Sequence, residues 1–397
     1  MGMNSIKILT GNSHPELGAL VSARLGVPLT ECVCRKFADQ SIDVRIGSSV
    51  RDQDVFVIQS GHSPYIDPND SLMELLIILS ACKTASARRI TAVIPSFPYS
   101  RQNKKDKSRV PITAKMIANI ITVAGAEHVI TVDLHASQIQ GFFDIPVDNL
   151  TCEPSIARWI RHKVDDWRDA IIVSPDAGGA KRATSLADAL GIDFALINRS
   201  RHLQRGRQRA NTGESQDMAS SLAHSQFSEV ANGVHSLSES GEWFITEEGG
   251  RRLRAGGIRK GPKVSEDTNV SEDENDSTME LLVGNVAGKT AILVDDMIDT
   301  KRTLALAYKT LEAAGAKRVF AVATHGVLSG HAMKLLSHLS IEKLVVTNTI
   351  ANQEKARDSK GKVEVLDMSA VIGETIRRSH HGESISTMFR QDAEMMF

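Results

Sequence analysis

Short runs of apolar and β-branched residues alternate with helical patterns along most of this chain, and this alternation constrains the fold more than any other feature. Each run is bounded by turn residues and has the length of a buried strand. The runs lie at residues 6–9, 55–59, 90–94, 129–132, 171–173, 194–197, 291–294, 319–323 and 344–347. Because strands that alternate with helices form parallel sheets flanked by helices, the sequence predicts the α/β class with mainly parallel sheets.

Local signals place the start of two helices. Ser71 and Glu74 have capping-box spacing ahead of the apolar run 72–79, which predicts a helix that begins at Ser71. Pro154 is a favourable first helical residue and predicts a second helix through residues 156–160. A weak repeat, in which small residues run into an apolar segment, relates residues 85–93, 124–132 and 314–322. It indicates either two similar halves or the ordinary junction between a helix and a strand.

Composition limits the class of protein. The 397 residues are enough for two or three domains, and the content of 41% hydrophobic but only 4% aromatic residues indicates an aliphatic core. Lys and Arg number 47 against 48 Asp and Glu, so the chain lacks the positive charge of a dedicated nucleic-acid binder. No apolar run is long enough to span a bilayer, and the 4 cysteines include no C-x-x-C pair. We therefore expect a cytoplasmic protein with reduced thiols and with neither nucleic acid nor membrane as a partner.

Residues 202–277 interrupt the alternating pattern. The segment is rich in Ser, Gly, Glu and Arg, with a basic stretch at 251–260 and an acidic one at 271–276. Such a composition buries too little apolar surface to offset the entropy of ordering, so it predicts a disordered insertion. A solvated linker explains the charge runs more simply than a motif that contacts a partner.

The segment 291–303 combines a strand with residues that suit a sugar phosphate. Its apolar run is followed by the acidic and hydroxyl residues Asp295, Asp296, Asp299, Thr300 and Thr303, and a helix begins there. Open α/β sheets bind ligands at the carboxyl ends of their strands, and helix amino termini accept phosphate through free N–H groups. Adjacent carboxylates suit the vicinal hydroxyls of a ribose, and the order of the elements resembles the phosphoribosyltransferase motif. The alternative is an acidic strand end with an N-capping Thr.

The segment 129–148 is the second candidate. A strand ends in Asp133, His135 follows two positions later, and Asp144 and Asp148 lie beyond a turn at Gly141. We expect Asp144 and Asp148 to fold back to the same edge of the sheet. Carboxylate oxygens suit Mg²⁺, which bridges to substrate phosphates, and the histidine suits a transferred phosphate. Taken as unconnected residues, these side chains would be ordinary surface polar groups.

Read as continuous strings, these segments resemble the signature of the ribose-phosphate diphosphokinases, the 5-phosphoribosyl-1-diphosphate (PRPP) synthetases. Similar blocks lie at 69–76, 95–109 and 174–182, so the resemblance covers nearly the whole chain outside the insertion. It implies two phosphoribosyltransferase-like domains: residues 1–153 joined by the tail 383–397, and residues 154–382, which contain the insertion. It also implies transfer of the β,γ-diphosphate of Mg-ATP to the C1 hydroxyl of ribose 5-phosphate, with release of AMP.

The resemblance assigns roles to residues. The implied magnesium site, with Mg²⁺ as cofactor, consists of Asp133, His135, Asp144 and Asp148. The implied ATP-binding residues are Phe37, Asp39, Arg101, Gln102, Lys104, Lys105 and Asp106. The implied ribose-5-phosphate-binding residues are Asp176, Gly178, Gly179, Asp295, Asp296, Asp299, Thr300 and Thr303. The implied catalytic residues are His135, Arg199 and Arg201, of which the two arginines lie in a flexible loop after the strand 194–197, where the insertion begins.

Several positions depart from the family pattern. Lys301 and Arg302 stand where the phosphate turn has glycine, Arg199 stands in place of Lys, Ser41 in place of Glu, and Asn103 in place of Asp. Glycine lets backbone amides approach a phosphate, which a Cβ atom hinders. Two hypotheses follow: an active PRPP synthetase within a homo- or hetero-oligomer of homologous subunits, and a weakly active or inactive subunit with a structural or regulatory role. The family also implies allosteric control by ADP and phosphate.

Overall fold

The computed structural model describes residues 6–105, 109–201, 277–299 and 301–389, which belong to one compact unit. They form sheets of 5, 7 and 2 strands, and the two larger sheets are mainly parallel and flanked by helices. The expected α/β class is therefore confirmed. Within these ranges, no helix combines the length and apolar character that a membrane crossing needs.

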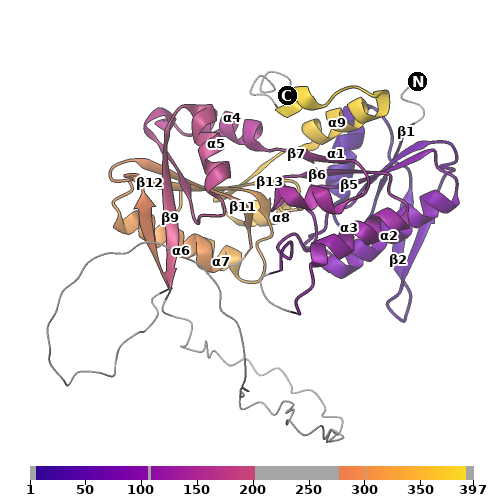
Figure 1. The fold of residues 1–397 in the computed structure, drawn as a ribbon, viewed down its shortest axis with the longest axis horizontal. Helices are drawn as coiled ribbons and strands as arrows, with labels where there is room; N and C mark the ends of the chain where they lie inside the picture. Colours follow the sequence, from indigo (N-terminus) through magenta and orange to yellow (C-terminus); the bar gives the residue numbers. More distant parts are fainter. Residues whose placement is uncertain (1–5, 106–108, 202–276, 300, 390–397) are drawn as a thin grey trace, which may run out of the picture. The chain divides into compact units, whose positions relative to one another are not determined.

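The first large sheet is entirely parallel. Its strands lie in the order β1 (Ile6–Thr10), β4 (Asp54–Ile58), β5 (Arg89–Ile94), β6 (His128–Val132) and β7 (Val147–Leu150). The helices around it are α1 (Pro15–Leu25), α2 (Pro68–Thr84), α3 (Thr113–Ala124) and α9 (Ser369–His381). Because successive strand residues point to opposite faces, Phe56 packs in the core with α1 and α9, whereas Val57 packs in the core with α2 and α3. Figure 1 shows the two pairs of helices on opposite faces of the sheet.

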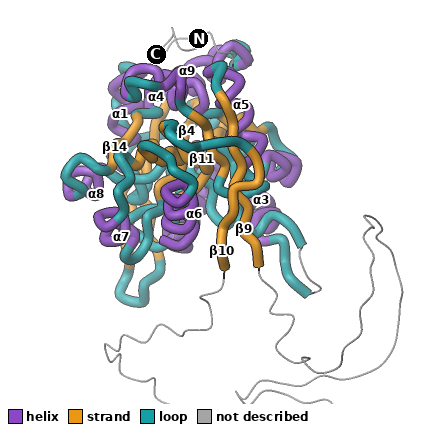
Figure 2. Tube along the Cα trace, turned by 90° about the vertical axis from the view of Figure 1, so that its left-hand side faces the viewer, coloured by secondary structure: helices purple, strands orange, loops and turns teal. Residues whose placement is uncertain are grey.

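The second large sheet has one antiparallel edge. Its strands lie in the order β10 (Ser277–Val283), β9 (Asp193–Arg201), β8 (Ile171–Ser174), β11 (Thr290–Ile298), β12 (Arg318–Gly326), β13 (Leu344–Thr347) and β14 (Val363–Leu366). Its helices are α4 (Glu153–Lys163), α5 (Ala180–Leu190), α6 (Lys301–Ala313), α7 (Ala332–His338) and α8 (Gln353–Asp358). Only β10 runs antiparallel, and Figure 2 shows it beside β9.

A continuous apolar cluster joins the two large sheets. Ile8 and Phe56 of the first sheet belong to the same buried cluster as Ile172 and Ile292 of the second. A small hairpin of β2 (Cys32–Lys36) and β3 (Ile42–Ile46) packs beside α2, and an ion pair of 2.5 Å joins Lys36 to Asp70. The cysteines of this hairpin, Cys32 and Cys34, are free. The division into domains at residue 153 stays a prediction.

Each predicted strand is present, but one predicted helix start is wrong. Helix α2 begins at Pro68, and the Asp67 carboxylate caps it by accepting a hydrogen bond of 2.8 Å from the Asn69 N–H. An Asp followed by Pro supplies both a cap and a favourable first residue, which outweighs the capping-box spacing at Ser71. Ser71 instead donates a 2.5 Å hydrogen bond from inside the helix to the Ser60 carbonyl.

The weak repeat has a structural cause. Its three segments begin where α2, α3 and α6 end, and they lead into β5, β6 and β12. The second residue of each segment has positive φ: 60° at Ser86, 126° at Gly125 and 82° at Gly315. Glycine tolerates this conformation and serine does not do so readily, so the repeat reflects one kind of turn rather than a shared function.

Candidate functional site

The carboxyl ends of the two large sheets touch each other. His135, just beyond β6, contacts Asp296 in β11 with 2.6 Å between Nδ1 and Oδ2. Asp133, which directly follows β6, accepts a 2.6 Å hydrogen bond at Oδ2 from the Thr324 hydroxyl in β12. The segments that the sequence singled out separately, 129–148 and 291–303, therefore meet at one place.

Asp295 and Asp296 form an unequal pair of carboxyl groups. Burial and the neighbouring charge of Asp296 raise the pKa of Asp295 to about 8. Burial acts to raise the pKa of Asp296 as well, but the His135 hydrogen bond and the Arg182 guanidinium, 3.3 Å away, outweigh it and hold that pKa well below its usual range. Near neutral pH, Asp295 is protonated and can donate a hydrogen bond, whereas Asp296 is ionised.

Asp299 links the implied ATP-binding loop to the implied pentose-phosphate turn. Its carboxylate accepts a 3.0 Å bond from Arg101 Nη1 and a 2.5 Å bond from the Ser329 hydroxyl. Lys355, whose ammonium donates to the carbonyls of Val327 and Leu328, has its pKa lowered by burial, and the charge of Asp299 opposes that shift. Thr303 lies in the first turn of α6, and Thr300 falls outside the described residues.

The loop between β8 and α5 carries Asp176, Gly178 and Gly179. The Asp176 carboxylate accepts a 2.9 Å hydrogen bond from the Gly179 N–H at the start of α5. A Cβ atom at Gly179 would lie 2.9 Å from the Ser174 hydroxyl, and one at Gly178 would lie 3.2 Å from Asp176 Oδ1. The two glycines thus keep this turn tight at the amino end of a helix, where phosphate is favoured. The charge of Asp176 also helps to raise the pKa of Asp295, after burial and Asp296.

The implied ATP-binding residues are only partly gathered. Gln102 accepts a 2.5 Å hydrogen bond from the Thr113 hydroxyl, which fixes its loop to the start of α3. Phe37 and Asp39 lie elsewhere, in the turn between β2 and β3, and no hydrogen bond or ion pair of the described residues joins them to Arg101. Lys104 and Lys105 are exposed, and Asp106 lies outside the described residues.

Two of the implied magnesium ligands lie at the wrong end of the sheet. Asp148 is in β7, paired in register with Ile130, and its carboxylate contacts His128 Nε2 at 2.9 Å, where β6 begins. Asp144 is exposed in the segment that precedes β7. The expectation that both fold back beside Asp133 is therefore wrong, because β7 runs parallel to β6 and its preceding residues lie toward the amino ends.

The implied magnesium set also fails as a group. No three His, Cys, Asp or Glu side chains in the described ranges are arranged to hold a metal ion. The donor types suit Mg²⁺, but Asp133 already uses Oδ2 for the Thr324 hydroxyl and the Cys152 N–H. The four residues therefore do not form a protein-only magnesium cage.

Two strands are longer than the sequence indicated. β11 continues through Ile298, so Asp295 and Asp296 are strand residues rather than residues of the loop. β9 continues through Arg201, so residues 199 and 201 occupy strand positions opposite Met279 and Ser277. The expected flexible loop does not begin at residue 198, and the arginine side chains and residues 202–276 lie outside the described part of the chain.

Sequence reasoning missed two histidines at the junction. His325 in β12 contacts the Val132 carbonyl through Nε2 at 3.1 Å. His62 follows β4 and contacts the Ser96 hydroxyl at 2.9 Å, and its pKa is lowered to about 4 by burial and by the nearby His325. The position of His62 just after a strand was a usable signal, whereas His325 lies within an apolar run and gave none.

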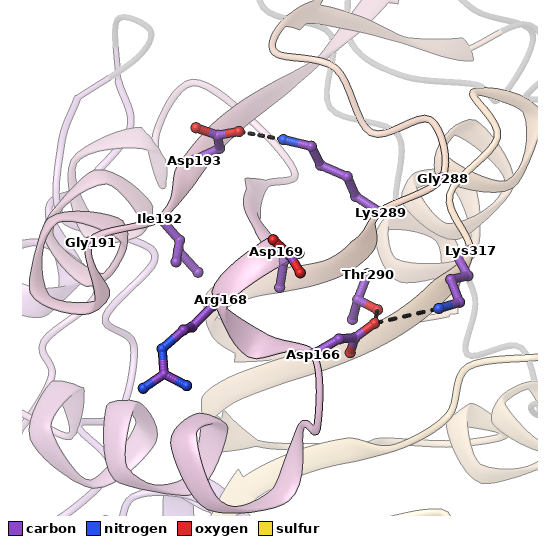
Figure 3. A pocket seen from close by; sticks show the side chains of 11 residues that line it. Asp166, Arg168, Asp169, Gly191, Ile192, Asp193, Gly288, Lys289, Thr290 and Lys317 are labelled. Atoms are coloured by element: carbon purple, nitrogen blue, oxygen red, sulfur yellow. Dashed lines mark hydrogen bonds and ion pairs between the residues drawn. The ribbon is translucent and has the colours of Figure 1, made fainter.

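A cavity of about 370 Å³ lies away from this junction, at the amino ends of β8, β9 and β11. Four of its charged lining residues form ion pairs with one another: Lys289 with Asp193, and Lys317 with Asp166 at 3.8 Å (Figure 3). Open α/β sheets bind ligands at the opposite ends of their strands, so the cavity is not the candidate site.

Known proteins resemble this chain along nearly all of its length. Residues 6–125 match the model of the N-terminal domain of ribose phosphate pyrophosphokinase, and residues 255–390 match that of the phosphoribosyl synthetase-associated domain. Ribose-phosphate pyrophosphokinase 2 of Schizosaccharomyces pombe is 47% identical over 390 residues, which cover 98% of each chain. The crystal structure of phosphoribosylpyrophosphate synthetase from Mycobacterium smegmatis is 33% identical, with a TM-score of 0.71, and the match covers 95% of this chain and 99% of that one.

Proposed function

Because the chain belongs to the ribose-phosphate pyrophosphokinase family, we propose that it transfers the β,γ-diphosphate of ATP to the C1 hydroxyl of ribose 5-phosphate and releases AMP. One observation carries the proposal: His135 and Asp296, from the ends of two different sheets, lie 2.6 Å apart. A nucleotide at one edge and a pentose phosphate at the other would meet there. The transfer requires chiefly that the reacting atoms are held in line and that developing charge is neutralised.

The pentose phosphate is assigned to the second sheet. Asp296, ionised, accepts from the ribose hydroxyls, and Asp295, protonated near neutral pH, donates to them. The 5-phosphate is assigned to the turn at Asp299 and the amino end of α6, because free N–H groups there favour an anion. The Asp176 loop contributes a second tight turn beside Asp295.

The nucleotide is assigned to the first sheet, with Arg101 and His135 nearest to its phosphates. A carboxylate only accepts, so His135 Nδ1 carries a proton and donates a hydrogen bond to Asp296, and Nε2 is left for the substrate. Mg²⁺ is assigned to the Mg-ATP substrate itself. It commonly keeps several waters and bridges phosphates, which agrees with the lack of a three-ligand protein site in the described residues.

Release of AMP from Mg-ATP by the purified chain tests the proposal. We expect AMP and PRPP to form in equal amounts only when ribose 5-phosphate is present, and we expect His135→Ala to abolish the reaction. A chain that is folded but inactive alone, and that raises the activity of a homologous subunit, would overturn the proposal and support a regulatory subunit. The helix α6 that begins at Lys301, where the family turn has glycine, is the feature that favours this alternative.

The finer expectations on assembly and place in the cell belong to the same proposal. We expect the chain to work in the cytoplasm within an oligomer of its own or of homologous subunits, with ADP and phosphate as regulators. Residues 255–390 are similar to the phosphoribosyl synthetase-associated domain, which supports the proposal that the partner subunits belong to the same family. The molar mass of the purified chain, with and without phosphate, checks the oligomeric state and the effect of phosphate on it.

A further inference from the structure

The backbone at Asp133 adopts an unusual conformation. Its φ is 39°, in the left-handed region that residues other than glycine seldom occupy, and such a conformation persists only when surrounding contacts impose it. Two hydrogen bonds hold the turn from the β7 side: the Asp133 N–H donates to the Leu150 carbonyl at 2.8 Å, and the Leu134 N–H donates to Asn149 Oδ1 at 3.0 Å. The turn is therefore fixed just before His135.

The Asp133 side chain holds the same turn from two further directions. Oδ2 accepts the Thr324 hydroxyl at 2.6 Å and the Cys152 N–H at 3.1 Å. Thr324 and Cys152 are both fully buried, at 0% exposure. Thr324 belongs to the second sheet and Cys152 to the segment that leads into α4, so a single carboxylate oxygen ties three parts of the chain together.

His325 completes this connection. Its Nε2 lies 3.1 Å from the Val132 carbonyl and 3.3 Å from the Asp133 carbonyl, and its Nδ1 lies 2.9 Å from the Thr349 hydroxyl. Carbonyls only accept, so Nε2 carries the proton and Nδ1 accepts from the threonine.

The structure assigns Asp133 the role of a positioning residue rather than a magnesium ligand: with Thr324 and His325, it fixes the turn that presents His135 to Asp296. The assignment rests on the proposed function, because it concerns the same junction. Two of the residues that would share a metal with Asp133 lie elsewhere, since Asp148 contacts His128 and Asp144 is exposed before β7. Asp133 therefore acts through its hydrogen bonds, which position the turn before His135.

Hydrogen exchange followed by mass spectrometry tests the assignment on the full-length chain without relying on turnover. Thr324→Val keeps the shape of the side chain but removes the hydroxyl, and Thr324→Ser keeps the hydroxyl. We expect exchange of the amides at residues 133–135 to be about tenfold faster in Thr324→Val, equivalent to the loss of about 1.4 kcal/mol, and to stay within twofold in Thr324→Ser. Equal exchange in the two variants would overturn the assignment.

Mg²⁺ alone, at millimolar concentration, is the second probe. We expect it to leave the exchange at residues 133–135 within twofold in the wild type. Slower exchange with Mg²⁺ that Asp133→Asn abolishes would overturn the assignment, because it would mark a bound metal. If Thr324→Val does not fold, Asn149→Ala, which releases the Leu134 N–H, replaces it, with Asn149→Asp as its control.

Measurements of enzyme turnover distinguish the proposed function from the positioning role of Asp133. If the chain is active, Thr324→Val should lower kcat about tenfold with an unchanged KM for ribose 5-phosphate, and Thr324→Ser should restore most of kcat. An inactive wild type would contradict the proposed function, yet the exchange measurements would still decide the role of Asp133.

Discussion

The acidic residues of β11 show how one side chain can set the protonation of the next. Asp296 stays ionised because His135 and Arg182 contact it, and that charge, together with burial, raises the pKa of Asp295 to about 8. Between pH 4 and 8 the folded state keeps a proton on Asp295 that the unfolded state releases. The Asp295 contribution to stability therefore falls as pH rises through this window, by at most about 1.4 kcal/mol per pH unit.

Asp295→Asn mimics the protonated side chain and removes this dependence. We expect the substitution to increase the free energy of unfolding by about 2 kcal/mol more at pH 7 than at pH 5, measured by urea denaturation at both pH values. Asp193→Asn, at an exposed carboxylate with 66% side-chain exposure, is the matched control and should show no such difference. An equal effect of Asp295→Asn at the two pH values would show that Asp295 is ionised in the folded protein.

Asp296, in the second sheet, contacts His135, which follows a strand of the first sheet, and so connects the two parts of the proposed site. Asp296→Asn removes the charge that His135 and Arg182 share, and we expect AMP release to fall at least about a hundredfold. Because Arg182 would lose its partner without losing its packing, the melting temperature should change by only a few degrees. In the same assay, Asp193→Asn should release AMP at the wild-type initial rate. A similar loss of rate in Asp193→Asn would mean that the loss in Asp296→Asn is not specific to the junction.

At the scale of elements, the sequence predicted the buried strands well and the edge strands poorly. β4, β5 and β13 are mainly apolar and are buried along all or nearly all of their length, which is the signal of a strand covered on both faces. β7 (sequence VDNL) and β2 (sequence CVCRK) carry polar residues, and neighbouring elements rather than their own composition make them strands. The wrong prediction for Asp148 has the same origin. Because β7 was not predicted as a strand, nothing in the sequence showed at which end of the sheet Asp148 lies.

The turns that end α2, α3 and α6 give a prediction for one element. Ser86 has φ 60°, where the equivalent turns have Gly125 and Gly315. Ser86→Gly should relieve this strain and raise the free energy of unfolding by about 0.5 kcal/mol, since the gain of about 1 kcal/mol exceeds the entropy that glycine adds to the unfolded chain. Ser86→Ala is the control and should not stabilise the protein. Chemical denaturation of both variants measures the difference, and stabilisation by alanine alone would contradict the explanation.

At the scale of the whole molecule, polar residues serve different purposes at the two ends of the strands. The carboxyl ends bring together His135 and Asp296, which are 161 positions apart in sequence. No local pattern encodes such a contact, so the sequence indicated the two half-sites but only the resemblance to a family joined them. The amino ends carry ion pairs with no candidate ligand, such as that of Asp54 with Arg89 and His380.

This division predicts that substitution by alanine has different effects on two arginines: Arg101, in the loop that follows β5, and Arg89, at the start of β5. Arg101, with 49% side-chain exposure, pairs with Asp299, and exposed pairs of this kind contribute under about 1 kcal/mol to stability. Arg89 contacts Asp54, whose side chain is only 3% exposed, through both carboxylate oxygens and also donates to the Ser379 carbonyl of α9. Removing Arg89 leaves a buried carboxylate beside His380, whose Nδ1 lies 2.7 Å from Asp54 Oδ2.

We therefore expect Arg101→Ala to weaken Mg-ATP binding at least about tenfold while changing the free energy of unfolding by less than about 1 kcal/mol. Arg89→Ala should instead reduce the free energy of unfolding by about 3 kcal/mol and leave Mg-ATP affinity within twofold, provided that binding is measured well below the melting temperature. Calorimetric titration and urea denaturation of both variants give the four values. If Arg101→Ala lost stability and kept its affinity for Mg-ATP, Arg101 would serve the fold through its contact with Asp299, and the assignment of the nucleotide phosphates to Arg101 would be wrong.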